Sequence, residues 1–283
     1  MLPTADFFGT QLTRLMYGDN PFNGHSYVEQ VHPGSEMVDY YIADRCVEAL
    51  FEAEKGGINA YMALADPFVM RVIQQYRQEG GKMKVLFQTY PAMDLDANLN
   101  MMMKFEPLGI YHQGGTADYF TESGQTEYLK ERLKKIKATG VPMGLGTHVP
   151  ETLLRAEEEG WGCDFYMACL YNARKEQKGQ QSGFITGKKK ELVFQRDDRF
   201  EMMEAIRKIP RPVIAFKILA GGQRLMNKTE PEVEREIETA FTEAFEGIKP
   251  GDFTLVGTFQ KNKNEIKQDC EIVDRVLKKL NMA

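Results

Sequence analysis

Eight short apolar runs alternate with longer amphipathic segments along the 283 residues of the chain. The runs are largely continuous, as expected of strands covered on both faces. They span residues 12–17, 58–64, 84–89, 107–112, 142–147, 164–170, 212–219 and 252–258. Eight strand–helix units without interruption predict a single (β/α)8 TIM barrel over residues 1–283, a fold that takes roughly 250 residues. An open Rossmann or flavodoxin-like sheet is the alternative, but no G-x-G-x-x-G follows the first run.

Local signals mark where helices begin and end. Gly56-Gly57 is expected to end a helix over 43–55, and Asp66-Pro67 is expected to begin the next helix. The one long irregular stretch, 173–198, follows the sixth run and would lie over the carboxyl ends of the strands. Loops of this length are often functional, so we predict a lid. Its Lys188, Lys189 and Lys190 either meet an anionic ligand or serve as solubilising charge.

Composition restricts the classes of partner. A net charge of −5 argues against nucleic acid, and no run reaches the roughly 20 apolar residues that span a bilayer. Cys163 and Cys169 lie in apolar sequence and are expected to be buried thiols. We therefore expect a cytoplasmic protein that binds a small-molecule substrate and neither nucleic acid nor membrane, with the oligomeric state open.

Polar residues at the carboxyl ends of barrel strands are the catalytic candidates in this fold. Three of the four histidines, His25, His112 and His148, follow strand-forming runs, and histidine suits acid–base chemistry or metal binding. The other candidates, in chain order, are Asp19, Asp66, Gln88, Thr89, Gln113, Thr147, Tyr171, Asn172, Lys217, Thr258, Gln260 and Lys261.

Lys217 and the segment after the eighth run suggest two kinds of chemistry. Lys217 interrupts an apolar run. It either points into the barrel, where desolvation would lower its pKa and make it a nucleophile or base, or extends its ammonium to solvent. Thr258, Lys261 and Lys263 surround the expected start of the last helix, where phosphate groups commonly bind.

The chain resembles the aldo/keto reductase family in an ordered series of segments. These are GINAYMAL, LGIYHQGG, GLGTHVPETLLRAEE, CDFYMACLYN, PVIAFKILAGG and LVGTFQKNKNEIKQD. The resemblance implies a barrel that binds NADP across its mouth, with Thr147, His148, Asn172, Thr258, Lys261 and Lys263 as cofactor-binding residues. It also implies that His112 is catalytic and orients a substrate carbonyl.

The rest of the family's catalytic Asp, Tyr, Lys and His set is replaced. The Asp position falls near Tyr61 or Met62, and the lysine position carries Gln88 or Thr89. Tyr61 or Lys217 would then have to supply the proton, and Gln88 stands among the catalytic candidates.

Three hypotheses remain open from the sequence. The first is a divergent NADP-dependent oxidoreductase acting on a small carbonyl or sugar-like substrate. The second is a lyase, isomerase or hydrolase that uses either a divalent metal held by His25, His112, His148 and Asp19 or a Schiff base on Lys217. The third is a non-catalytic barrel, although a decayed site should not retain so many polar side chains.

Overall fold

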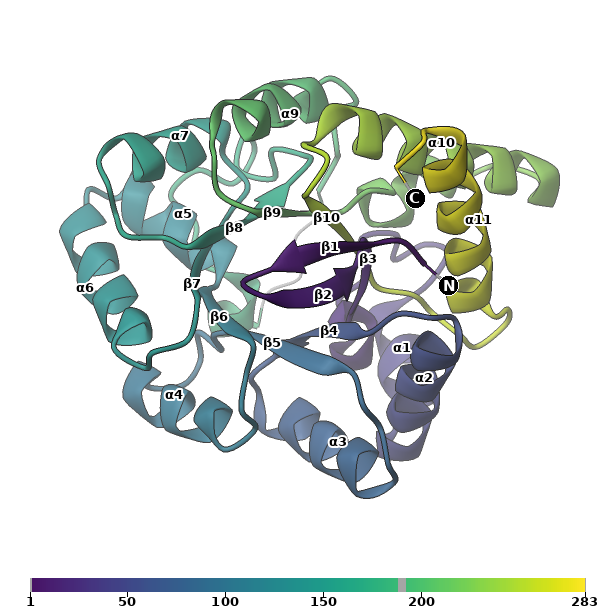
Figure 1. Ribbon diagram of the computed structural model, residues 1–283, viewed down its shortest axis with the longest axis horizontal. Coiled ribbons are helices and arrows are strands. Elements are labelled where there is room, and N and C mark those ends of the chain that lie inside the picture. The colour runs from purple at the N-terminus through teal and green to yellow at the C-terminus, as the bar shows by residue number, and fades with distance from the viewer. Residues whose placement is uncertain (1, 188–191, 283) are drawn as a thin grey trace. The chain divides into compact units, whose positions relative to one another are not determined.

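The computed structural model describes residues 2–187 and 192–282 (Figure 1). Eight parallel strands close into a barrel in the order β10-β3-β4-β5-β6-β7-β8-β9, with helices between them, so the predicted (β/α)8 barrel is confirmed. The barrel strands are β3 (Leu15–Gly18), β4 (Ala60–Leu64), β5 (Lys84–Gln88), β6 (Gly109–His112), β7 (Met143–Thr147), β8 (Phe165–Cys169), β9 (Val213–Phe216) and β10 (Phe253–Val256).

The chain divides into two compact units. The first comprises Met1–Lys84, Lys217–Glu246 and Phe253–Ala283, and the second comprises Val85–Phe216 and Gly247–Asp252. The first unit contains η1 (Asn20–Asn23), α1 (Gly34–Tyr40), α2 (Ala43–Lys55), α3 (Pro67–Gln78), η2 (Ala220–Leu225), most of α10 (Glu230–Gly247) and α11 (Glu265–Lys279). The second contains α4 (Leu95–Met103), α5 (Gly114–Glu122), α6 (Thr126–Lys137), α7 (Pro150–Glu158), α8 (Gly183–Thr186) and α9 (Asp198–Lys208).

Helix starts in the first unit follow the sequence signals. Helix α2 has the predicted bounds, and Asp66 caps α3 as expected. The Asp66 carboxylate accepts hydrogen bonds from the backbone N–H groups of Phe68 at 2.7 Å and Val69 at 2.9 Å. These bonds satisfy donors that the first helical turn leaves without partners.

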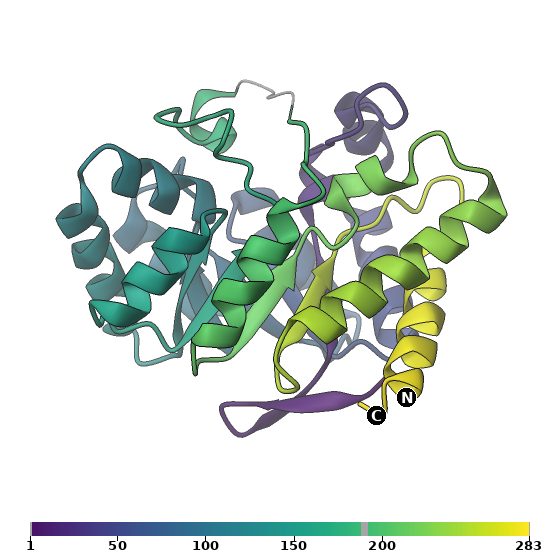
Figure 2. The same cartoon turned by 90° about the horizontal axis from the view of Figure 1, so that it is seen from above.

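The first apolar run does not form one strand. Leu12 belongs to an antiparallel hairpin of β1 (Thr4–Phe7) and β2 (Thr10–Thr13), and β3 begins only at Leu15. Figure 2 shows the hairpin beside the amino end of β3. Phe7 is fully buried there, with its ring 5.8 Å from that of Phe253 at the start of β10.

The seventh apolar run is also shorter than predicted. Strand β9 ends at Phe216, and Lys217 adopts a left-handed backbone with φ of 60°. Lys217 is therefore not part of a strand, and the prediction of a strand that extends to residue 219 is wrong. A non-glycine residue in this region carries backbone strain that neighbouring structure must hold in place.

Strand register in the second unit separates side chains that line the barrel from those that face the helices. Tyr166 donates a hydrogen bond to Glu157 of α7, so it faces outward. Leu145 is its partner on β7 and His112 is the partner of Leu145 on β6, so these two also face outward. Side chains alternate along a strand, which places a second set on the inner face: Gln88, Tyr111, Phe165, Met167, Cys169 and Phe216.

Two further findings concern the described residues. All four cysteines are buried free thiols, as expected for Cys163 and Cys169. In the same part of the chain, every helix is too short or too polar to cross a lipid bilayer.

Candidate functional site

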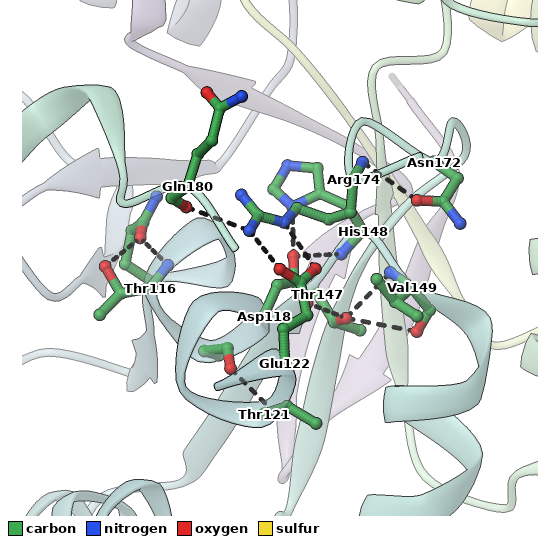
Figure 3. Close-up of polar contacts among 12 residues, drawn as sticks. Thr116, Asp118, Thr121, Glu122, Thr147, His148, Val149, Asn172, Arg174 and Gln180 are labelled. Atoms are coloured by element: carbon green, nitrogen blue, oxygen red, sulfur yellow. Dashed lines mark hydrogen bonds and ion pairs between the residues drawn. The ribbon is translucent and has the colours of Figure 1, made fainter. Parts of the chain in front are cut away.

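A buried carboxylate holds a histidine at the carboxyl end of β7 (Figure 3). Asp118 of α5 is fully buried, and its Oδ2 lies 2.8 Å from Nδ1 of His148 and 3.1 Å from the His148 backbone nitrogen. Thr147 donates its hydroxyl to the other oxygen, Oδ1, at 2.5 Å. A carboxylate only accepts hydrogen bonds, so Nδ1 carries the proton. This arrangement leaves Nε2 as the basic nitrogen of the ring.

Two glycines bring Asp118 to this position. Helix α5 begins directly after β6, and Gly114 in its first turn packs against the backbone of Gly146 on β7. A Cβ atom on Gly146 would lie 2.9 Å from the Gly114 nitrogen, and a Cβ on Gly114 would lie 3.1 Å from the Gly146 carbonyl carbon. Asp118 follows Gly114 by four residues and so lies on the same helix face. The close backbone contact therefore sets the carboxylate against the end of β7.

The N-cap of α5 also helps to fix the position of the helix that carries Asp118. Gln113 is the N-cap residue, and its side-chain oxygen accepts from the backbone nitrogen and the hydroxyl of Thr116, both at 2.7 Å. The Gln113 backbone nitrogen in turn donates to the hydroxyl of Thr89 at 3.0 Å. These contacts tie the start of α5 to β5 and β6, so the residue that orients His148 rests on regular elements.

Phe216 contacts His148, and further polar side chains lie on or just beyond other strands of the second unit. The ring of Phe216 at the end of β9 lies 5.6 Å from the imidazole, edge to face. Gln88 accepts a hydrogen bond from the Tyr111 hydroxyl at 2.5 Å. Tyr171 lies two residues beyond the inward-facing Cys169 and is almost fully buried. Its hydroxyl has no hydrogen-bond partner among the described residues.

The described part of the segment 173–198 is anchored to the second unit. The guanidinium of Arg174 forms two hydrogen bonds with Glu122 of α5, at 2.8 and 2.5 Å, and a third with the Gln180 carbonyl. Phe184 in α8 packs edge to face against Tyr90, which follows β5, and Phe194 packs against Tyr171. Figure 2 shows this segment beyond the carboxyl ends of β7 and β8. Lys188, Lys189 and Lys190, which we expect either to meet an anionic ligand or to serve as solubilising charge, lie outside the described residues.

The structure gives His112 a structural environment. Its side chain is fully buried and faces α6, where Nε2 accepts a hydrogen bond from Nε of Arg132 at 2.9 Å. Nδ1 lies 3.2 Å from the Gln113 carbonyl. Burial, and then the charge of Arg132, lower the pKa of His112 to about 3. Because both ring nitrogens are engaged and the ring faces away from the barrel interior, these contacts argue against the catalytic role that the resemblance implies.

Tyr61 is likewise hydrogen-bonded within the protein. Its hydroxyl donates to the Asp19 carboxylate at 3.0 Å, and the same oxygen accepts from the Leu64 nitrogen at 2.8 Å. Burial raises the pKa of Asp19 to about 7 and raises that of Tyr61 well above its usual value. A carboxyl group therefore stands beside Tyr61, contributed by the end of β3 rather than by β4. A fully buried phenol with a raised pKa makes a poor proton donor to a substrate.

Lys217 lies over an aromatic ring of the first unit. Its Nζ is 4.4 Å from the centroid of Tyr27, in the range of a cation–π contact. A Cβ on Gly221 would lie 2.7 Å from the same ring, so the loop after β9 packs closely against Tyr27. A cation–π contact favours the charged ammonium. This contact therefore does not support the neutral nucleophile that a Schiff base requires.

The residues expected to bind the cofactor phosphate already have partners. Lys261 forms an ion pair with Glu36 at 2.5 Å, and Lys263 forms one with Glu230 at 2.8 Å. The hydroxyl of Thr258 is buried and contacts Tyr17 and Gln260. Lys261 lines a hollow of about 490 Å³ with Pro33, Ser35, Glu36, Asp39 and Tyr40. Because two carboxylates line this hollow beside a single lysine, these residues do not fit a phosphate group.

Three further residues near the expected cofactor site are buried or hydrogen-bonded within the protein. The Glu265 carboxylate in the first turn of α11 accepts from the Phe259 nitrogen at 2.8 Å. Asp269, one turn further along, is buried. In the second unit, Asn172 accepts from the Arg174 nitrogen at 3.0 Å and is half-buried. The role of Asn172 in cofactor binding stays a prediction.

The metal alternative finds no support in the side-chain arrangement. No three His, Cys, Asp or Glu side chains are grouped as metal ligands in the described ranges. His112 is committed to Arg132 and Asp19 to Tyr61, as described above. His25 lies in the connection after η1. His148 keeps Asp118 as a carboxylate partner but gains no second ligand in this part of the chain.

Comparison with known proteins gives structural likenesses at low identity. The fold is similar to an aldo/keto reductase from Brucella melitensis, with a TM-score of 0.57, 14% identity, and coverage of 97% of this chain and 94% of that one. It is also similar to a mutant of Gox0644 in complex with NADPH, with a TM-score of 0.59 and 11% identity over 96% and 88% of the chains. A third similar structure is dihydropteroate synthase from Yersinia pestis, with a TM-score of 0.52 and 11% identity over 99% of both chains.

Sequence comparison finds nothing further. No protein-family model matches the chain, and no curated protein matches it significantly. The solved structures differ from one another in the activities that their names describe, so the likeness establishes the barrel fold alone.

Sequence reasoning missed Asp118, although it included His148. Asp118 lies 30 residues before His148, on a helix that the apolar pattern did not predict. The signal that could have found it is the pair of glycines in LGIYHQGG and GLGTH, which allow the backbone of α5 to approach β7.

Proposed function

We propose that this protein is a barrel enzyme that transfers protons to or from a small carbonyl or sugar-like substrate, with His148 as the general acid–base. The observation that carries the proposal is the Asp118–His148 pair at the carboxyl end of β7. A buried carboxylate on Nδ1 fixes the tautomer and stabilises the imidazolium that forms when Nε2 accepts a proton. The carboxyl ends of barrel strands are also where enzymes of this fold carry their catalytic groups.

The first test is the effect of removing each member of the pair. Replacing His148 by Ala should lower kcat for any substrate found in an aldehyde, ketone and sugar screen by about 10²–10⁴-fold, the usual contribution of a positioned acid–base. Asp118→Asn should lower it by a similar factor, because an amide can stabilise the wrong tautomer. His32→Ala, which changes a histidine outside the pair, should stay near wild type. Full activity in His148→Ala would refute the assignment.

An NADP-dependent oxidoreductase is the second candidate function. The similarity of the fold to Gox0644 in complex with NADPH favours it. The ion pairs of Lys261 and Lys263 and the carboxylates beside them count against it. NADPH, when bound, would supply a hydride, and His148 would still handle the proton.

Calorimetric titration with NADPH separates the two candidates. If the paired lysines exclude the cofactor phosphate, no heat should appear at millimolar NADPH, and the enzyme should be sought among isomerases and lyases. A micromolar dissociation constant that weakens about tenfold or more in Lys261→Ala would instead support the reductase. Lys279→Ala, at the far end of α11, is the control for general loss of positive charge.

A further inference from the structure

Tyr171 carries a buried hydroxyl without a hydrogen-bond partner among the described residues, at the end of β8. Native proteins pair most of their buried polar groups, because an unpaired group loses water and gains nothing in return. Such a group is expected to have a partner that is absent from the isolated chain, such as a bound molecule.

Tyr171 and His148 follow the carboxyl ends of the neighbouring strands β8 and β7. Thr147 pairs with Ala168 and Cys169 with Phe216, so β7, β8 and β9 end side by side. His148 follows the outward-facing Thr147 by one residue, and Tyr171 follows the inward-facing Cys169 by two. The backbone pattern continues past β8, since the Leu170 nitrogen donates to the Phe216 carbonyl at 3.1 Å. The two side chains therefore start from neighbouring strand ends, and the His148 ring contacts the inward-facing Phe216.

The anchored segment 173–198 begins two residues after Tyr171. Phe194 from this segment packs against the Tyr171 ring, with 5.4 Å between the ring centres. Asn172 donates its backbone N–H to Asp198 at 3.1 Å, which closes the segment on itself. The Tyr171 ring is thus held by packing, while its hydroxyl takes no part in holding the fold.

We propose that the Tyr171 hydroxyl binds an oxygen atom of the substrate, a carbonyl or hydroxyl oxygen of a small hydroxy-carbonyl compound. This inference rests on the proposed function of His148, because the two residues would act on one ligand. Tyr171 can donate to a carbonyl oxygen or accept from a hydroxyl, and either bond satisfies the orphaned group. The ligand would thereby be positioned with its reacting carbon toward the strand end that bears His148.

The first test needs no substrate and compares Tyr171→Phe with Tyr166→Phe. Tyr166 lies on β8 and Tyr171 follows that strand by two residues, but the Tyr166 hydroxyl donates to Glu157 at 2.9 Å. Removing an unpaired hydroxyl should leave Tm unchanged or raise it by a few degrees, whereas Tyr166→Phe should lower it by a few degrees. A fall in Tm for Tyr171→Phe as large as that for Tyr166→Phe would mean that the hydroxyl has a structural partner, and the proposal would fail.

The second test measures binding of glyceraldehyde by calorimetry. Tyr171→Phe should weaken binding about tenfold, in line with a lost hydrogen bond, while His148→Ala should retain binding and lose turnover. Equal affinity of Tyr171→Phe and wild type, or no binding by the wild type, would overturn the role of Tyr171. Wild-type binding and turnover that survive in His148→Ala would overturn the proposed function and leave the Tyr171 contact standing.

Discussion

Asp118 and Asp19 are two buried aspartates that use their carboxylates differently. Asp118 accepts hydrogen bonds from the Thr147 hydroxyl, a backbone N–H and the imidazole of His148, and so orients the proposed acid–base at the end of β7. Asp19 receives the hydroxyl of Tyr61 and the Leu64 nitrogen, and so joins the ends of β3 and β4. At the scale of the residue, the hydrogen-bond partners decide whether a buried carboxylate orients a histidine or joins two strand ends.

The raised pKa of Asp19, about 7, predicts a pH-dependent cost to stability. Between about pH 4 and pH 7 the folded protein retains a proton that the unfolded chain has released, so wild-type stability falls as pH rises. Asp19→Asn keeps an acceptor oxygen but cannot ionise. Its free energy of unfolding relative to wild type should therefore rise by up to about 4 kcal/mol from pH 4 to pH 7.

Urea unfolding of both proteins at several pH values measures this difference. Parallel stability profiles for wild type and Asp19→Asn would show that Asp19 is ionised at the same pH in the folded and unfolded states.

Among the elements, the N-terminal hairpin of residues 4–13 was not predicted, because the first apolar run begins only at residue 12. Arg14, between β2 and β3, donates its backbone N–H to the Pro3 carbonyl at 2.9 Å, which ties the strand connection to the start of the chain. Phe7 then lies against Phe253 at the start of β10, while the neighbouring Phe8 at the hairpin tip is 46% exposed. Within the first unit the hairpin thus covers the amino ends of β3 and β10.

Adjacent phenylalanines offer a matched test of the hairpin. Phe7→Ala should lower the free energy of unfolding by about 3–5 kcal/mol, because it leaves a cavity beside Phe253. Phe8→Ala removes a half-exposed ring and should cost less than about 1 kcal/mol. Chemical denaturation of the two variants measures both values, and similar losses would indicate that the hairpin contributes no packing of its own.

For the whole molecule, the amino-acid sequence by itself determined the eight strands, most of the helices and therefore the closed barrel. These features are local: apolar runs of strand length, glycine stops such as Gly56-Gly57 and caps such as Asp66 act within a few residues. The sequence also placed His148 and Tyr171 at strand ends, because strand ends follow directly from the runs.

Tertiary structure alone decided which of those polar side chains have partners. His112 and His148 look alike in sequence, each at the end of an apolar run, yet one faces Arg132 of a helix and the other rests on Asp118. Strand register chose the face, since a shift of one residue reverses the direction of a side chain. The close approach of Gly114 and Gly146 then places Asp118 beside His148. These two residues are 30 positions apart in the sequence, so their contact depends on tertiary packing and produces no periodic pattern.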